Sequence, residues 1–394
     1  MTLAQDVNKK VSLVDKLLPL LIILAIIIGI VISVYAPNAQ SSFGGVTVVG
    51  VSVPLAVGMI IMMIPPFFKV RWEFLNQTMF TRLFARSMMI SFVLNWIICP
   101  LFMLALAWLT LFDQPEFRTG IIMIGTARCI AMVVLWNDIA GGSTDLCAII
   151  VVVNSLLQLV LYAPYQLLLC YVISGDPIPS MISYSLVAKT LVFFLGIPIV
   201  AGIVLRFLAK ISIGVEMGTK FLSPFAPLGL LYTVIVIFIE KGKDFLHETG
   251  PAFRCFAPLF VYFVVVWNAT FFGLRWLLGR TVLVQEENEP LLCGCEKEKE
   301  SNPKAWKMWC SAPYQEVATH AFTAASNNFE LSLSVAISLY GANSKQAIAA
   351  TFGPVLEIPL LMILCFVSLY FRRIFLWLDV RSEATEEPVT SDSS

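Results

Sequence analysis

The chain is poor in charged side chains. Only 13% of its 394 residues are Asp, Glu, Lys or Arg, about half the share found in soluble globular proteins. The 26 basic and 26 acidic residues cancel, so there is no net positive charge to attract a nucleic acid, and we exclude that partner. Histidine occurs twice, and the sequence has no phosphate-binding glycine loop, zinc-protease motif or serine-triad pattern. We therefore expect neither an enzyme nor a resident cofactor.

Cysteine usage excludes a further class of protein. The nine cysteines are an odd number and lie mostly inside apolar runs, which argues against a secreted disulfide scaffold. Apolar residues, in contrast, make up 58% of the chain, and the mean hydropathy is +0.85. This composition is typical of a protein that spans the lipid bilayer several times.

We predict an all-α polytopic membrane protein with ten transmembrane helices, because ten apolar stretches are long enough to span. The first stretch lacks a small-residue cleavage site, which indicates a helix rather than a signal peptide. The predicted spans are 17–36, 48–68, 87–111, 120–138, 146–173, 185–205, 222–240, 256–279, 316–340 and 347–371.

The distribution of basic residues predicts the orientation. With the N-terminus in the cytosol, nineteen of the 26 Lys and Arg residues fall on the inner side, six fall on the outer side, and Arg128 lies within a span. The positive-inside rule then places both termini in the cytosol. The predicted segments are a cytosolic N-terminus (1–16), a first five-helix repeat (17–173), an extracellular linker (174–184), a second five-helix repeat (185–279 and 308–378), a charged cytosolic loop (280–307) and a cytosolic tail (379–394).

Weak internal repeats relate the two halves. The recurring segments are Gly29–Val31 and Gly202–Val204, Thr126-Ala127 and Thr323-Ala324, Ala148-Ile149 and Ala347-Ile348, and Gln158 and Glu357. Since each half has an odd number of spans, the halves would have opposite orientations, which predicts a 5+5 inverted repeat. Transporters of this kind bind substrate near the midplane at interrupted helices. We expect the discontinuous helices to be spans four and nine, which polar residues interrupt most densely, and we expect them to cross there.

Span four carries Arg128 followed by Cys129. A charged group at this depth costs about 2.5–3.5 kcal/mol or more, so it marks either a transport pathway or a structural ion pair. A thiol beside an arginine is favoured as thiolate, and it would be a soft ligand for a thiophilic metal or metalloid. The alternative is that Cys129 is an apolar filler. Cys147, at the inner end of span five, could approach it.

Span nine carries Asn327, Asn328 and Glu330 among small and apolar residues. A carboxyl group in a low-dielectric environment retains a proton readily and is suited to proton carriage. The alternative is a permanent ion pair, for example with Arg128. Three further side chains are candidates for the same cavity: Glu357 and the amides Asn154 and Gln158 in span five. Glu357 is a weaker candidate for proton carriage than Glu330, because Gln158, its counterpart in the repeat, cannot titrate.

The stretches Thr126–Asn137 and Ala324–Glu330 closely resemble the signature helices of the arsenite-efflux permeases of the arsenical-resistance family. This family belongs to the superfamily that includes the bile acid:sodium symporters. The resemblance runs from about Leu17 to Leu378, and the long loop between spans eight and nine resembles that of eukaryotic, especially fungal, members.

The resemblance implies export of trivalent arsenite, sometimes antimonite, driven by the proton gradient. It implies that Cys129 is the essential thiol, a ligand of As(III), and that Glu330 is the important acidic residue. The other residues in the matching motifs, which we expect to bind substrate, are Arg128, Trp136, Asn137, Asn327 and Asn328. We expect the plasma membrane as the location, with the vacuolar membrane as the alternative.

The residues favour the same mechanism. Arsenous acid is neutral at neutral pH, so a single soft thiolate would recognise it while leaving it exchangeable. Glu330 would then alternate between protonated and ionised forms. Two alternatives remain: a sodium-coupled organic-anion symporter of the same fold, and a non-transporting metalloid sensor that uses Cys293 and Cys295 in the charged loop. The oligomeric state cannot be inferred from these patterns.

Overall fold

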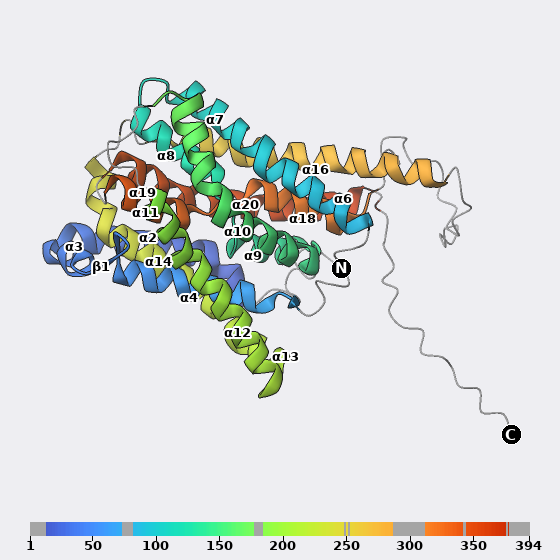
Figure 1. Cartoon of the computed structure of the whole chain (residues 1–394), viewed down its shortest axis with the longest axis horizontal. Helices are drawn as coiled ribbons and strands as arrows, with labels where there is room; N and C mark the ends of the chain where they lie inside the picture. Colours follow the sequence, from blue (N-terminus) through green and yellow to red (C-terminus); the bar gives the residue numbers. More distant parts are fainter. Residues whose placement is uncertain are drawn as a thin grey trace.

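The computed structural model describes residues 13–72, 82–176, 184–247, 250, 253–286, 312–341, 344–375 and 377. The chain is almost entirely helical (Figure 1). The first half contains α2 (Leu13–Tyr35), α3 (Pro37–Gly44), β1 (Thr47–Val48), β2 (Val51–Ser52), α4 (Val53–Lys69), α6 (Arg82–Phe92), the π-helix η2 (Val93–Ile98), α7 (Cys99–Thr110), α8 (Pro115–Thr126), α9 (Met132–Ala140), α10 (Thr144–Gln166) and the π-helix η3 (Leu167–Ile173). The second half contains α11 (Tyr184–Leu191), the π-helix η4 (Val192–Gly196), α12 (Ile197–Ile211), α13 (Val215–Leu222), α14 (Phe225–His247), α16 (Phe256–Glu286), α18 (Tyr314–Ala325), α19 (Phe329–Tyr340) and α20 (Lys345–Ile374).

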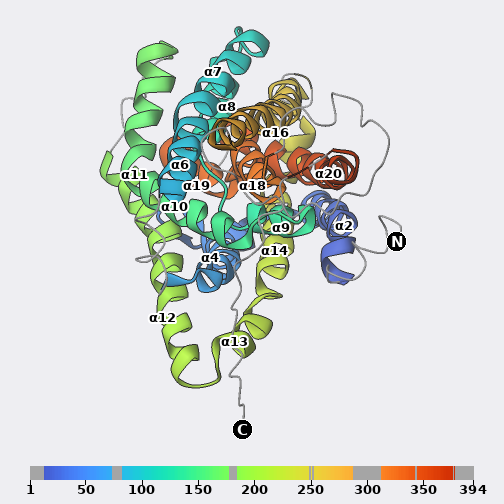
Figure 2. The ribbon, with the colours of Figure 1, turned by 90° about the vertical axis from the view of Figure 1, so that its right-hand side faces the viewer.

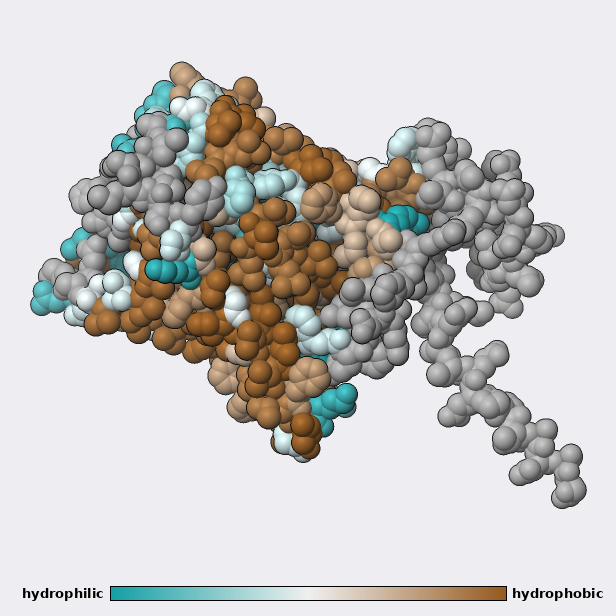
Figure 3. Space-filling view, viewed as in Figure 1, coloured by the Kyte–Doolittle hydropathy of each residue, from teal (hydrophilic) through white to brown (hydrophobic). Residues whose placement is uncertain are grey.

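The molecule is an integral membrane protein. Six helical segments within the described residues are long and apolar enough to cross a bilayer. Large apolar side chains point outward along these and the shorter helices, for example Leu20, Leu24, Ile27 and Val31 on α2. Their spacing of three and four residues defines one helix face. Figure 3 shows the resulting apolar surface in brown, as expected where lipid replaces water as solvent.

The helices form two packed groups (Figure 2). We call α2, α4, α12 and α14 the panel; within it, α14 packs along α2 and α4, and α12 packs along α4. We call α7, α8, α9, α10, α16, α18, α19 and α20 the core; α20 contacts α8, α9, α16 and α19. This arrangement surrounds the short half-helices of the core on several sides, so residues between them are buried.

Two of the π-helices lie beside prolines. Pro100 follows η2 and Pro198 follows η4, and in each case the residue four positions earlier, Trp96 or Phe194, lies within the π-helix. A proline lacks the backbone N–H and clashes with that carbonyl in a regular α-helix. The π turn changes the hydrogen-bond register locally, so the membrane-spanning helix continues past the proline.

The helix interruptions lie in the two spans where they were expected. The chain leaves helical geometry between Thr126 and Met132, and again between Ala325 and Phe329. These breaks divide each span into two half-helices, α8 and α9, and α18 and α19. Both breaks contain consecutive buried residues, so their free backbone groups require internal partners.

The structure adds detail to two predicted segments without testing their boundaries. Helix α16 continues to Glu286, beyond the expected start of the charged loop at residue 280. Asp176, expected in an extracellular linker, is buried and accepts a hydrogen bond from Arg118. The predicted N-terminus up to residue 12, most of the charged loop with Cys293 and Cys295, and the tail lie outside the described residues.

Gly353 permits the close approach of α20 to α19. A Cβ atom at this position would lie 1.5 Å from the ring of Phe329. We therefore expect Gly353→Ala to lower the melting temperature in detergent, because overpacking of a close-packed interior costs about 1–3 kcal/mol. Gly273→Ala on α16 is the matched control, since nothing lies within 4 Å of a Cβ there. Equal melting temperatures for the two variants would show that α20 can move away from α19 without loss of stability.

Candidate functional site

The two interrupted helices meet at their breaks. Arg128 and Asn327 form an isolated antiparallel β-bridge, and the backbone N–H of Asn328 donates to the carbonyl of Ala127 over 3.1 Å. The C-terminal ends of α8 and α18 and the N-terminal ends of α9 and α19 therefore converge at this point, which we call the crossing. Helix ends carry partial charges, negative at the C-terminus and positive at the N-terminus, so the crossing is a polar centre inside an apolar protein.

Arg128 balances the negative ends. Its guanidinium is fully buried and donates to the carbonyl of Gly125 in the last turn of α8 and to that of Ala324 in the last turn of α18, the latter over 3.5 Å. It also donates to the hydroxyl of Tyr262, 3.3 Å away on α16. The positive charge thus lies at two helix C-termini, where cations are stabilised.

The expected alternative of an Arg128–Glu330 ion pair is wrong. Among the described residues, the guanidinium contacts carbonyl oxygens and a hydroxyl, and it forms no salt bridge with Glu330. Two helix-end carbonyls and the hydroxyl of Tyr262 accept from its terminal nitrogens, so the charge is held at the helix ends. Glu330 is therefore free of a fixed counter-charge from span four.

Gln158 holds the backbone of the first break. Its side-chain carbonyl accepts from the N–H of Arg128 over 2.9 Å, and its amide nitrogen donates to the carbonyl of the same residue over 3.0 Å. The side chain was expected to line a cavity, but it replaces the helical hydrogen bonds that the break removes.

Replacing Gln158 by leucine leaves two buried backbone groups without partners. We expect the free energy of unfolding to fall by about 1–3 kcal/mol for each group, which lowers the melting temperature of the detergent-solubilised protein. The control is Gln166→Leu on the same helix, where the side-chain nitrogen is buried without a hydrogen-bond partner in the described part of the chain. An equal loss in both variants would contradict the backbone role of Gln158.

Four side chains from three elements gather beside the breaks. Cys129 interacts electrostatically with Glu357 and Glu330 and is adjacent to the hydroxyl of Ser326. Ser326 donates to one carboxylate oxygen of Glu357 on α20. The other oxygen of Glu357 and the Oε1 of Glu330 are buried without a partner among the described residues. Unpaired buried oxygens indicate positions for water or for a ligand that forms hydrogen bonds.

The second break orients Glu330. The side chain of Asn328 caps α19 by accepting from the N–H of Leu331 over 3.0 Å. Glu330 lies in the first turn of that helix, where a negative charge is favoured. Asn327 contributes its backbone to the bridge with Arg128, while both polar atoms of its side chain have no partner in the described structure.

The remaining predicted residues lie away from the crossing. Asn137 on α9 accepts from Thr319 over 2.8 Å and so joins α9 to α18. The backbone carbonyl of Trp136 lies 3.4 Å from the sulfur of Cys365 on α20. Asn137 is the sixth residue of α9, which places it about 7–8 Å beyond the start of that helix. The two residues are thus packed inside the core rather than next to Cys129.

Two predicted accessory residues have packing contacts. The amide oxygen of Asn154 accepts from the indole of Trp96 over 3.0 Å and joins α10 to η2. The sulfur of Cys147 lies 4.0 Å from the carbonyl oxygen of Val133, and it is within electrostatic range of Cys129. All six described cysteines are free and buried. No cluster of three or more His, Cys, Asp or Glu with metal-site geometry occurs among the residues that the structure covers.

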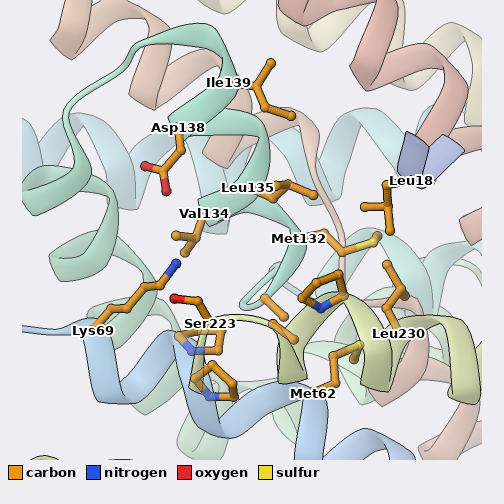
Figure 4. A pocket seen from close by; sticks show the side chains of 15 residues that line it. Leu18, Met62, Lys69, Met132, Val134, Leu135, Asp138, Ile139, Ser223 and Leu230 are labelled. Atoms are coloured by element: carbon orange, nitrogen blue, oxygen red, sulfur yellow. The ribbon is translucent and has the colours of Figure 1, made fainter. Parts of the chain in front are cut away.

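A cavity of about 170 Å³ connects the panel with the first break (Figure 4). Ala131 and Met132, the second and third residues after Cys129, contribute to its wall. Lys69 and Asp138 extend toward each other at one side of it. The other lining residues are mainly apolar and come from α2, α4, α9 and α14, together with Ser223 at the end of α13. The volume accommodates several water molecules, so it is large enough for a small solute.

Sequence reasoning missed Tyr262 and Ser326. Tyr262 donates to Ala324 over 3.1 Å and accepts from Arg128, but a tyrosine in an apolar span has no sequence signal that distinguishes it. Ser326 lies directly before the conspicuous Asn327 and Asn328. Its position inside the interrupted segment was the signal that could have identified it.

Comparisons with known proteins place the chain in a family. The sodium bile acid symporter family matches residues 56–248. An arsenical-resistance protein Acr3 from Corynebacterium glutamicum is 34% identical over 369 residues, covering 92% of this chain and 90% of that protein. An Acr3 from Alkaliphilus metalliredigens is 24% identical over 375 residues (92% and 94%), and an uncharacterized transporter from Synechocystis sp. is 26% identical over 377 residues (90% and 88%). The chain therefore belongs to the family of the Acr3 arsenical-resistance proteins, within the sodium bile acid symporter family, and is a transporter rather than an enzyme.

Proposed function

We propose that this protein is a secondary active transporter that exports trivalent arsenite from the cytosol in exchange for protons. The observation that carries the proposal is the crossing itself, where one thiol and a carboxylate oxygen that has no partner among the described residues lie at two helix breaks next to a cavity. The names of two relatives, both arsenical-resistance proteins, support the substrate class.

The architecture that we propose is ten transmembrane helices in a 5+5 inverted repeat. Six long apolar helices occur among the described residues, and the shorter apolar helices within α2 and α4 extend the set. The pairs α8/α9 and α18/α19 would be spans four and nine, each crossing as two half-helices. Inverted repeats place interrupted helices at equivalent positions in the two halves, which is where these breaks occur.

Cys129 would bind the substrate. Arsenic(III) is thiophilic, and a soft ligand recognises it even when the species is neutral. With one thiol rather than three, the bound arsenic exchanges readily, as transport requires departure as well as entry. Antimonite shares this chemistry and is the second substrate that we would test. The oxygen ligands of the bound acid would contact Ser326 and the carboxylates beside it.

Glu330 would carry the proton. Its Oε1 has no fixed partner in the described structure, so its charge is not neutralised permanently. We propose that the ionised form accompanies bound arsenite and that the protonated form accompanies the empty site. The ionised state then carries arsenite out of the cytosol, and the protonated state carries a proton back in. This alternation is antiport.

The cavity between panel and core would be the cytosolic entrance. Basic residues mark the same end of the protein, including Lys69 on α4, Arg86 on α6 and Arg372 on α20. By the positive-inside rule this end would face the cytosol, and both termini would then be cytosolic. Export from the cell favours the plasma membrane, with the vacuolar membrane as the alternative that localisation would distinguish.

A sodium-coupled organic-anion symporter is the second candidate, since the matching family is named for sodium and bile acid. The test is arsenite uptake into everted vesicles, with an outward proton gradient (acidic interior), a sodium gradient or neither. We expect accumulation only when the vesicle interior is acidic. Accumulation driven by sodium alone would establish the symporter instead, and arsenite binding without flux would establish a sensor.

A further inference from the structure

Several buried side chains outside the crossing have no hydrogen-bond partner among the described residues, and His320 is the one of them that can titrate. His320 on α18 is fully buried, and neither ring nitrogen has a partner within the described residues. Buried polar groups are almost always paired, and an unpaired one calls for an explanation. A phenylalanine or leucine would fill such a site without the cost of desolvating two nitrogens. The imidazole therefore requires a chemical rather than a packing explanation.

The charged groups around His320 lie on one side of it. Glu316 is one turn earlier on α18 and accepts from Arg86 on α6 over 3.0 Å and from Ser87 over 2.5 Å. Two charged groups act on His320. Arg86 lies on α6, which packs against α18, and Glu316 lies on α18 itself. The side chain of Arg86 is 33% exposed, so this pair connects His320 to the surface of the protein.

The opposite side of His320 leads to the crossing. Ser326 follows six residues later on the same chain, and a helix rises about 1.5 Å per residue, so the crossing is about 9 Å away. Thr323 lies on the same helix face, three residues after His320. Asn327 follows in the break, just beyond the end of α18. Both polar side-chain atoms of Asn327 are without a partner in the described part of the chain. Buried water molecules would satisfy these atoms and bridge the gap.

We propose that His320 relays the proton from the crossing to the cytosolic face, an inference that rests on the proposed proton antiport. When the site faces the cytosol, the carboxyl O–H of Glu330 breaks, and the proton passes through water to one ring nitrogen of His320. The imidazolium then releases the proton on its other nitrogen to water beside Glu316. The imidazole returns to its neutral form, and Glu330 is left as carboxylate.

The test compares two transport modes in everted vesicles. One is arsenite uptake driven by the proton gradient, which requires proton release. The other is exchange of labelled for unlabelled arsenite at equal pH and concentration, which does not. We expect His320→Gln to slow gradient-driven uptake about tenfold or more and to leave exchange within about twofold of wild type. His247→Gln, at the chain's other histidine, is the matched control and should change neither mode.

Each other outcome is decisive. Unchanged gradient-driven uptake in His320→Gln would overturn the relay. Loss of both modes in folded protein would assign His320 a packing role only. If His320→Gln does not fold, His320→Asn replaces it in the same comparison. Failure of the proposed function looks different, because the wild type itself would then show no gradient-driven uptake.

Discussion

Cys129→Ser abolishes arsenite transport in our prediction. The hydroxyl is nearly isosteric with the thiol but is a hard ligand with little affinity for As(III). The carboxylates and Ser326 beside it would remain in place. We therefore expect both gradient-driven uptake and exchange to fall by about a hundredfold or more, since the interaction is required for binding in every transport mode.

The control is Cys170→Ser, another buried free thiol, which lies in η3 rather than at the crossing. Uptake into everted vesicles, together with size-exclusion chromatography to verify folding, measures the effect. Retention of transport by Cys129→Ser would mean that the thiol is a packing residue and that the substrate is not recognised through sulfur.

Glu330→Gln is expected to uncouple arsenite from protons. The amide is similar in size but cannot titrate, so net uptake driven by the gradient should fall by about a hundredfold or more. Because the amide resembles the protonated form, which binds arsenite more weakly, exchange should continue only at saturating arsenite. In the wild type, raising the pH ionises Glu330 and should strengthen arsenite binding. In Glu330→Gln, arsenite binding should not change over the pH range in which Glu330 titrates in the wild type. A pH-sensitive dye inside the vesicles reports whether protons leave as arsenite enters.

Glu357→Gln is the matched comparison. In the proposed repeat its mate is Gln158, an amide. Ser326 donates to a carboxylate oxygen of Glu357 that the amide carbonyl can replace. We expect coupling to survive this change. Uncoupling in Glu357→Gln with normal coupling in Glu330→Gln would assign the proton site to α20 instead.

The binding measurement also separates Glu330 from His320. A relay changes how fast protons leave but not which states bind arsenite. His320→Gln should therefore retain the pH dependence of arsenite affinity that Glu330→Gln loses. Loss of that dependence in both variants would mean that His320 titrates as part of the binding site.

The sequence was sufficient to predict the class of protein and the location of the interruptions. Apolar runs of spanning length and few charges have one stable environment, the bilayer. Polar residues inside spans four and nine indicated where the helices break, because such residues are tolerated only where they line a cavity or satisfy free backbone groups. This reasoning selected Arg128, Cys129 and Glu330 as candidate site residues.

The partners of those residues required the tertiary structure. Arg128 could have paired with Glu330 by charge alone, yet it lies at the C-terminal ends of α8 and α18. Gln158 appeared to be a cavity residue, but it pairs with the backbone of Arg128. Hydrogen bonds that join residues 30 or more positions apart leave no periodic pattern in the sequence.

The sequence by itself determined that this chain spans a membrane, where polar side chains enter the apolar interior, and which family signature it carries. These features follow from composition, run length and local motif, each of which is written in neighbouring residues. Only the tertiary structure decided which helix ends meet, which side chains complete the crossing, and that His320 lies buried without a partner in the described structure. Such facts depend on contacts between distant segments, and the packing of helices in three dimensions determines those contacts.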